Sequence, residues 1–274
     1  MGKIHTIFKY CQYSKFLTKV VYTMENSEKR RFFDVSSAAL HIMAMFFMLL
    51  DHAWATVVPG AEWMTSVGRI AFPIFAFLLT EGYFHTHNFK KYMLRLLFFA
   101  VISEIPFNLM YGGQAIYIYH QNVLWSFLIS LSGMWFIDHI KKRGKPWLTV
   151  LTAALTIFLC AVAGQLLMVD YYGAGILMVF VFYLFHGRKW WCILGQLAGM
   201  YFVNIHLLGS MYYTAHIFGL ELHLYQQGLA LLALIPIWLY KGRQGYHSKA
   251  FKYFCYAFYP AHIALLVLTA YLIG

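Results

Sequence analysis

Charged residues are scarce in this chain. They make up only 11% of its 274 residues, and 61% are hydrophobic, whereas soluble globular domains carry roughly 25% charged residues. Too few polar groups remain to cover a water-soluble surface. Apolar stretches recur between short polar breaks, which fits helices of about 20 residues better than barrel strands with alternating polar positions. The sequence therefore predicts an all-α, polytopic helix bundle embedded in a lipid bilayer.

Cysteine is also rare. The four cysteines are Cys11, Cys160, Cys192 and Cys255. They form no C-x-x-C pair, so the sequence indicates neither a disulfide framework nor a zinc site. The 13 histidines include no H-E-x-x-H motif, and His85 and His87 would not share one face of a helix. We therefore expect no metal site.

The net charge of +11 comes from basic residues gathered at a few points. Seven of the 21 Lys and Arg residues precede residue 32. Basic residues also occur in the predicted loops 87–92, 140–146, 187–189 and 241–253. The alternate loops have none, and they cover residues 59–67, 111–121, 168–171 and 208–225. By the positive-inside rule this grouping reports membrane topology, and we expect no nucleic-acid partner.

The apolar segments predict about nine membrane-spanning helices with a cytoplasmic N-terminus and an external C-terminus. Their ranges are 36–58, 68–86, 93–110, 122–139, 147–167, 172–186, 190–207, 226–240 and 254–273. The segment 208–225 is too apolar for an ordinary loop, so we expect a re-entrant or interfacial segment there.

Two parts of the chain are expected. Residues 36–274 form one membrane domain, and residues 1–35 form a basic extension. The first 23 residues carry four lysines and no acidic residue, and Met24 would itself make a natural start. The extension is therefore either an interfacial basic helix or an over-long start.

Ionisable residues interrupt the first predicted span in the sequence MFFMLLDHAWATVVPG. Asp51 and His52 lie roughly 22–24 Å along the helix from Ser36, in the outer half. Arg69 is the one cation on the external side, and it begins the returning helix. We therefore expect an Asp51–Arg69 ion pair. Ionisable residues inside a membrane are costly and usually functional.

A third helix adds Ser103, Glu104 and Asn108 to the outer half, and Asp170 precedes the sixth predicted span. A polar cluster facing outward is thus drawn from at least three helices. The alternative is a structural ion network that only holds the helices together.

The inner half has a different character. Glu81 lies about 18 Å beyond Arg69, and His85 follows Glu81 by one turn on the same helix face. Lys90, Lys91 and Arg95 come next. A basic, histidine-containing vestibule at the cytoplasmic mouth would suit a polyanionic donor such as a nucleotide-containing cofactor. Ordinary positive-inside anchors would explain Lys90 and Lys91 equally well.

His52 is the leading candidate for chemistry. Adjacent helical residues point about 100° apart, so Asp51 does not orient the ring of its neighbour. We expect Asp51 to be held by Arg69 while His52 faces a cavity. An imidazole is the natural general base at physiological pH.

Four sequence blocks carry a resemblance to a known family. They read MAMFFMLLDHAW, VGRIAFPIFAFLLTEGYFHTHNFKKYMLRLLFFAVISEIPFNL, YYGAGILMVF and YFCYAFYPAHIALL. The chain resembles the TraX family from about residue 36 to its C-terminus; the family is named for a membrane protein that acetylates the N-terminus of F pilin. The matching residues are Asp51, His52, Gly68, Arg69, Phe72, Pro73, Glu81, Gly82, His85, Thr86, Arg95, Ser103, Pro106, Tyr259, Pro260 and His262. Glu104 departs from the family, which more often has glutamine there.

The resemblance implies an acyltransferase of the bacterial inner membrane with acetyl-CoA as the acyl donor. His52, Asp51 and Arg69 become the expected catalytic residues, with His52 acting as a base or as an acyl relay. Arg69, or a backbone amide freed near Pro73, would stabilise the oxyanion. The residues assigned to the donor are Glu81, His85, Arg95, Ser103 and His262. The acceptor stays open and is a pilin-like peptide, a glycan or a small molecule.

Two alternatives use the same residues. In a proton-coupled transporter or flippase, Asp51, Glu81 and His52 would relay protons. An odd number of spans and no detectable repeat speak mildly against the usual transporter plans. A catalytically silent assembly scaffold is the other alternative.

Overall fold

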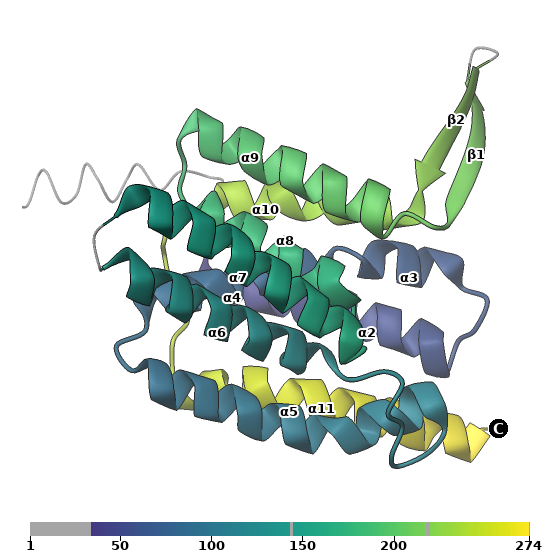
Figure 1. Ribbon diagram of the computed structural model, residues 1–274. Helices are drawn as coiled ribbons and strands as arrows, with labels where there is room; N and C mark the ends of the chain where they lie inside the picture. Colours follow the sequence, from purple (N-terminus) through teal and green to yellow (C-terminus); the bar gives the residue numbers. More distant parts are fainter. Residues whose placement is uncertain (1–33, 143–144, 218–219, 274) are drawn as a thin grey trace, which may run out of the picture.

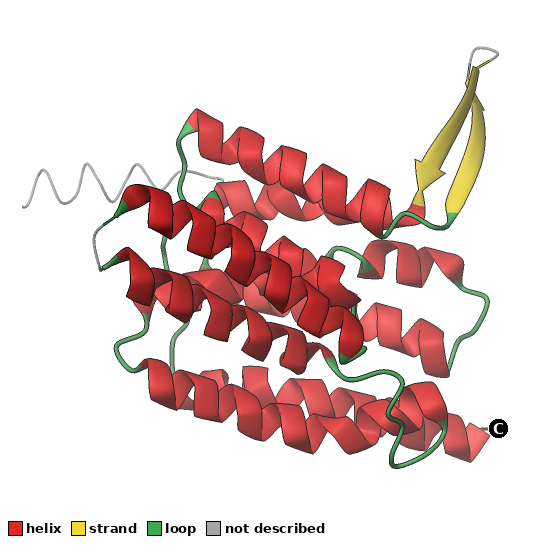
Figure 2. Ribbon diagram, in the orientation of Figure 1, coloured by secondary structure: helices red, strands yellow, loops and turns green. Residues whose placement is uncertain are grey.

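The computed structural model describes residues 34–142, 145–217 and 220–273. The extension predicted for residues 1–35 lies outside these ranges except for its last two residues. Helices dominate the molecule (Figures 1 and 2). The long helices are α2 (Ser37–Thr56), α4 (Ala71–His85), α5 (Phe89–Gly112), α6 (Val123–Lys141), α7 (Pro146–Leu166) and α11 (Lys249–Ile273). The shorter helical elements are α3 (Glu62–Gly68), α8 (Tyr172–Leu184), α9 (Trp190–Tyr201), η1 (Phe202–Leu207), η2 (Gln226–Ala233) and α10 (Leu234–Leu239).

Local sequence signals explain several helix ends. Ser36, Asn88 and Asn122 precede α2, α5 and α6, and each side chain accepts a hydrogen bond from a backbone N–H in the first turn. Such caps satisfy backbone donors that have no partner within the helix. Pro146 occupies the first turn of α7, where its missing N–H costs nothing. Gly113 ends α5 with a φ of 64°, a conformation that favours glycine.

The helices run side by side between two ends of the molecule (Figure 1). The α5 and α11 helices pack together and form one layer, and α11 also contacts α2. The α4 helix contacts α2, α6 and α8, and most of its side chains are buried. In contrast, α7 buries only Thr156 and Gly164. The α4 helix is therefore central, whereas α7 presents an apolar outer surface of the kind that faces lipid.

In the described part of the chain, six helical segments are long and apolar enough to cross a membrane. One of them consists of α3 and α4 counted as a single span, and the others are α2, α5, α6, α7 and α11. The segment Tyr172–Leu184 and the segment Gln226–Leu239 are apolar but shorter. Each of the nine predicted segments is helical, so the prediction of a helical membrane protein is confirmed.

The prediction of an all-α molecule needs one correction. Within the segment 208–225, where we expected a re-entrant or interfacial segment, strands β1 (Tyr212–Ile217) and β2 (Leu220–Tyr225) form an antiparallel hairpin. The hairpin projects away from the helices (Figure 2). Polar and apolar residues alternate in Leu220–Tyr225, a period that favours a strand and that the overall apolar character obscured.

A second correction concerns the predicted loop 59–67. The α3 helix lies there, so the helical structure begins before residue 68, and Arg69 lies between α3 and α4 within the apolar segment Glu62–His85. The chain then turns at Arg69 and Ile70 into α4.

Candidate active site

Two histidines distant in the sequence meet between α2 and α11. Nδ1 of His52 lies 2.7 Å from Nε2 of His262. The two ring planes differ by only 4°, and their centroids are 4.9 Å apart. Both side chains are buried. Nδ1 of His262 lies 2.6 Å from the carbonyl oxygen of Phe258. This histidine pair, His52 and His262, is the central feature of the site.

Tyr259 lies beside the histidine pair on α11. Its ring meets the His52 ring edge-on, with centroids 6.2 Å apart. The Tyr259 hydroxyl is buried and lies next to the Val123 backbone.

Asp51 is held by its own set of contacts, as expected. Its carboxylate accepts a hydrogen bond of 2.6 Å from the Thr65 hydroxyl, which in turn accepts one of 2.6 Å from Arg69. The Arg69 guanidinium lies 3.6 Å from the same carboxylate oxygen. Thr65 therefore links the two opposite charges, and the Asp51–Arg69 pair predicted from the sequence is present.

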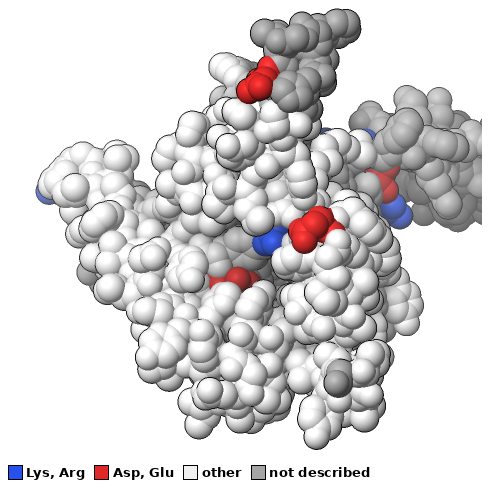
Figure 3. Space-filling model, turned by 90° about the vertical axis from the view of Figure 1, so that its right-hand side faces the viewer, with Lys and Arg blue, Asp and Glu red and all other residues white. Residues whose placement is uncertain are grey.

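Further polar groups lie near this ion pair at the same end of the helices. Asp170 accepts hydrogen bonds from His120, at 3.3 Å, and from the Tyr171 backbone, at 3.1 Å. Tyr171 stacks on Phe72, with ring centroids 4.3 Å apart. Asp51, Arg69 and Asp170, which belong to different segments, are thus brought together at one end of the molecule, as the sequence predicted. The face at this end is almost free of charged side chains except around a central hollow (Figure 3).

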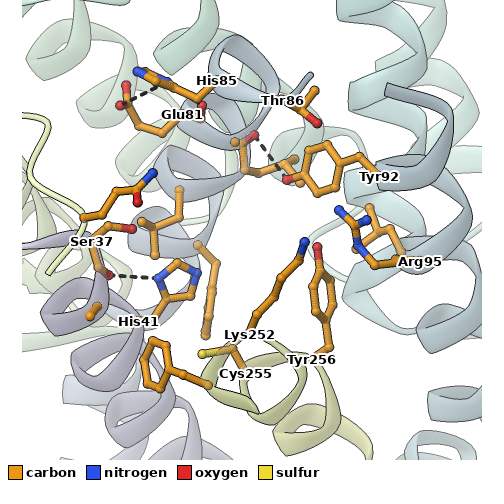
Figure 4. Close-up of a pocket in the computed structure, with 18 of the residues that line it drawn as sticks. Ser37, His41, Glu81, His85, Thr86, Tyr92, Arg95, Lys252, Cys255 and Tyr256 are labelled. Carbon is orange, nitrogen blue, oxygen red and sulfur yellow. Dashed lines mark hydrogen bonds and ion pairs between the residues drawn. The ribbon is translucent and has the colours of Figure 1, made fainter. Parts of the chain in front are cut away.

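The opposite half contains a cavity of about 480 Å³. Its walls come from α2, α4, α5, α6, α11 and the segment 240–248. The side chains of His41, Arg95 and Lys252 point toward its centre (Figure 4). The volume falls in the range of about 300–1,000 Å³ that is typical of small-molecule sites.

Positive charge dominates one wall of this cavity. Arg95 lies between the rings of Tyr92 and Tyr256, with its guanidinium carbon 5.9 Å from each centroid. Its Nε is buried and has no hydrogen-bond partner among the described residues. Lys252 comes from α11 on the same side (Figure 4). A guanidinium held by aromatic rings with a spare donor is well suited to bind a phosphate.

Glu81 lies on another wall, where it binds other protein groups. Its carboxylate contacts His186 at 2.6 Å and His85 at 3.9 Å. Glu81 and His85 line the cavity as expected, but Glu81 is mainly engaged in joining α4 to neighbouring segments.

Two residues assigned to the donor do not line this cavity. Ser103 is fully buried in α5, and its hydroxyl has no partner among the described residues. His262 is bonded to His52 instead. Glu104, the departure from the family pattern, accepts hydrogen bonds from Asn122 and from Trp125. These contacts join α5 to the start of α6.

Three cavity residues of α11 were not assigned to the site by sequence reasoning: Lys252, Cys255 and Tyr256. Tyr259 also lines the cavity and had been matched to the family without a role. Their spacing of three or four residues places them on one helix face. A polar stripe at helical spacing in an apolar segment would have revealed them.

The cavity ends close to the histidine pair. Met48, one turn before His52, lines its wall, and so does Tyr259, whose ring touches His52. His52 itself does not line the cavity. One layer of side chains therefore separates the cavity from the pair, and the Asp51 cluster lies on the other side.

The comparison with protein families now identifies the chain. The sequence model described as TraX protein matches residues 36–270. The chain belongs to the TraX family. The match covers the resemblance found in the sequence and contains all residues of the histidine pair, the Asp51 cluster and the cavity.

One curated relative of this TraX protein is described as "Probable fimbrial assembly protein FimC, serogroup H1", from Dichelobacter nodosus. It is 30% identical over 249 residues, which cover 85% of this chain and 95% of the relative. No solved structure matches the chain.

Proposed function

We propose that this TraX protein is an acyltransferase of the bacterial inner membrane that transfers an acetyl group from acetyl-CoA to an amine or hydroxyl acceptor. One observation carries the proposal: a cationic cavity opens at one end of the bundle and stops next to a buried histidine pair, with a polar cluster on the far side. Donor and acceptor would therefore approach the same imidazole from opposite ends.

The donor is assigned to the cavity by its chemistry. Acetyl-CoA carries phosphates at one end and a thioester at the other. Arg95 and Lys252 supply positive charge for the phosphates, and Arg95 has a donor to spare. The thioester would reach past Tyr259 toward His52, after a small movement of the intervening side chains.

The proposed reaction exchanges one bond at the acetyl carbon. The acceptor nitrogen or oxygen bonds to that carbon while its proton passes to His52. The carbon–sulfur bond then breaks, and the proton is delivered to the departing sulfur to give the free thiol. In the alternative route, Nε2 of His52 bonds to the acetyl carbon while the thiolate leaves; the acceptor then takes the acetyl group from His52, and its proton passes to the thiolate. Arg69 is held by Thr65 and Asp51, so its role as an oxyanion donor requires its remaining N–H groups.

The topology proposed from the sequence fits this scheme. Apart from Arg69, the described lysines and arginines lie at the end of the molecule where the cavity opens. They occur in the loops there or in the adjoining parts of the helices. With that end in the cytoplasm, the N-terminus is inside, nine segments enter the membrane and the Asp51 cluster faces outward. Acetyl-CoA would then enter from the compartment in which it is made.

The acceptor is proposed to lie at the external face. The resemblance to a pilin-acetylating family and the relative described as a fimbrial assembly protein favour a pilin-related peptide. A glycan or a small molecule with an amine or hydroxyl group is the other candidate. The hollow beside the Asp51 cluster (Figure 3) is where an amine would approach.

The test is transfer of radiolabelled acetyl groups by protein purified into nanodiscs. Peptides with a free or a blocked N-terminal amine serve as paired acceptors. We expect His52→Gln to lower the rate by about 10²–10⁴-fold, the usual contribution of a general base. His206→Gln, at an exposed histidine of η1, is the matched control and should leave the rate unchanged. A wild-type protein that neither hydrolyses acetyl-CoA nor transfers label contradicts the proposal.

Proton-coupled transport remains the rival because ionisable groups lie on both sides of the histidine pair. Glu81 lines the cavity and Asp51 lies in the opposite half. Proton-driven uptake in liposomes that is abolished by Asp51→Asn and indifferent to acetyl-CoA would favour it. Acetyl transfer that survives collapse of the proton gradient would exclude it as the main activity.

A further inference from the structure

The hydrogen bonds of the histidine pair determine where its protons lie. A backbone carbonyl oxygen only accepts hydrogen bonds. Nδ1 of His262, which lies 2.6 Å from the Phe258 carbonyl oxygen, must therefore carry a proton. In a neutral imidazole the other nitrogen is then an acceptor, so Nε2 of His262 presents a lone pair to His52.

The same reasoning fixes the proton on His52. Its Nδ1 lies 2.7 Å from Nε2 of His262 and must donate the proton of that bond. The Nε2 atom of a neutral His52 is consequently unprotonated. The hydrogen bond that the His52 ring makes to His262 uses Nδ1 and leaves Nε2 outside the pair. The arrangement thus leaves a basic nitrogen free on His52 and fixes which nitrogen it is.

Among the described residues, no carboxylate is hydrogen-bonded to the histidine pair. Asp51 is the nearest acidic residue in sequence, but its carboxylate is bound by Thr65 and Arg69. His262 is itself held firmly, because Phe258 stacks on its ring with centroids 4.7 Å apart and an interplanar angle of 13°. Tyr259 packs against the same ring.

We propose that His262 is a positioning residue for His52. The hydrogen bond to the Phe258 carbonyl sets the tautomer of His262, and the bond between the two rings then holds His52 in the tautomer with an unprotonated Nε2. This inference rests on the proposed function for its catalytic consequence, and it replaces the donor-binding role assigned to His262 from the family resemblance. Setting the tautomer of a catalytic histidine is a known use of a hydrogen-bonded neighbour.

The histidine pair and the Phe258 carbonyl also stabilise the positive charge that forms on His52 during acyl transfer. When Nε2 of His52 takes the acceptor proton, the ring becomes a cation, and its Nδ1 proton is hydrogen-bonded to Nε2 of His262. The positive charge is thereby shared with a second ring whose own N–H is bound to a carbonyl. Return of the proton from Nε2 to the thiolate sulfur restores the starting state.

Nitrogen NMR of protein labelled with ¹⁵N-histidine tests the tautomer directly. His52 is assigned from the signals lost in His52→Gln. We expect a protonated Nδ1 and an unprotonated Nε2 on His52, with a scalar coupling across the hydrogen bond to Nε2 of His262. A proton on Nε2 of His52 in the wild-type protein overturns the proposal, whatever the enzyme activity.

Variants of His262 supply the second readout. His262→Phe keeps a buried ring but removes the acceptor, so we expect the His52 tautomer preference to disappear. The kcat should fall by about 10²-fold, with the KM for acetyl-CoA changed by less than about threefold. His262→Gln offers an amide oxygen to Nδ1 of His52 and should restore part of both properties. His206→Phe is the control.

The outcomes separate this inference from the proposed function. A raised KM for acetyl-CoA at unchanged kcat in His262→Phe would return His262 to the donor site and reject the positioning role. The expected tautomer in a protein without acyl transfer would support the positioning role and reject the acyltransferase proposal. If His262→Phe does not fold, the wild-type spectrum and His262→Gln still decide, because neither depends on that variant.

Discussion

Arg95 illustrates how a single side chain can be held ready for an anionic ligand. Two tyrosine rings flank its guanidinium, and its buried Nε has no partner among the described residues. A hydrogen bond to a charged group contributes about 1.5–3 kcal/mol. Loss of such a bond would weaken donor binding by roughly 10- to 100-fold.

We therefore expect Arg95→Gln to raise the KM for acetyl-CoA by about tenfold or more, with a smaller change in kcat. Steady-state kinetics of acetyl transfer measure both constants. Lys90→Gln is the control, because Lys90 is exposed and does not line the cavity. Equal effects of the two substitutions would show that only the general positive charge matters.

At the scale of elements, the contact between α2 and α3 depends on one glycine. A Cβ atom at Gly68 would lie 2.5 Å from Asp51 Cβ and 3.0 Å from its Cγ. The absent side chain lets Asp51 approach the turn that carries Arg69. Any larger residue must push the two helices apart and disturb the ion pair.

We expect Gly68→Ala to destabilise the protein by about 1–3 kcal/mol, as overpacking usually does. Thermal unfolding in detergent measures the change. Gly228→Ala is the matched control, since its Cβ would meet the flexible end of Ile205 at 3.0 Å and Tyr225 Cβ at an ordinary 3.8 Å. Its effect should stay within about 0.5 kcal/mol. Equal stability of both variants would mean that α2 and α3 adjust freely.

The α11 helix shows what local sequence can and cannot predict. Its apolar character predicted a helix over 254–273, and the structure extends it back to Lys249. The stripe from Lys252 to His262 could have been read from its spacing. In contrast, nothing in the stripe indicates that α11 packs between α2 and α5, because helix neighbours are chosen by the shapes of whole surfaces.

At the scale of the molecule, the distribution of charge predicts its orientation. Basic residues gather at the end where the cavity opens, and the Asp51 cluster lies at the other. The positive-inside rule places the first end in the cytoplasm. Exposed residues at the two ends, such as Gln114 and Lys142, can report this arrangement.

We expect Gln114→Cys to react with a membrane-impermeant maleimide in intact cells, and Lys142→Cys to react only after the membrane is permeabilised. Both substitutions are made in a chain whose four native cysteines are replaced by serine. The opposite pattern would invert the proposed topology and would place the acetyl-CoA cavity outside the cytoplasm.

The sequence by itself determined that this is a helical membrane protein and where its helical segments lie, because apolar segments in lipid must satisfy their backbone hydrogen bonds internally. It also paired Asp51 with Arg69, since a short turn joins their helices. Only the tertiary structure paired His52 with His262, which are 210 residues apart. No local period encodes that contact; it arises because α2 packs against α11 and brings two buried imidazoles within hydrogen-bonding distance.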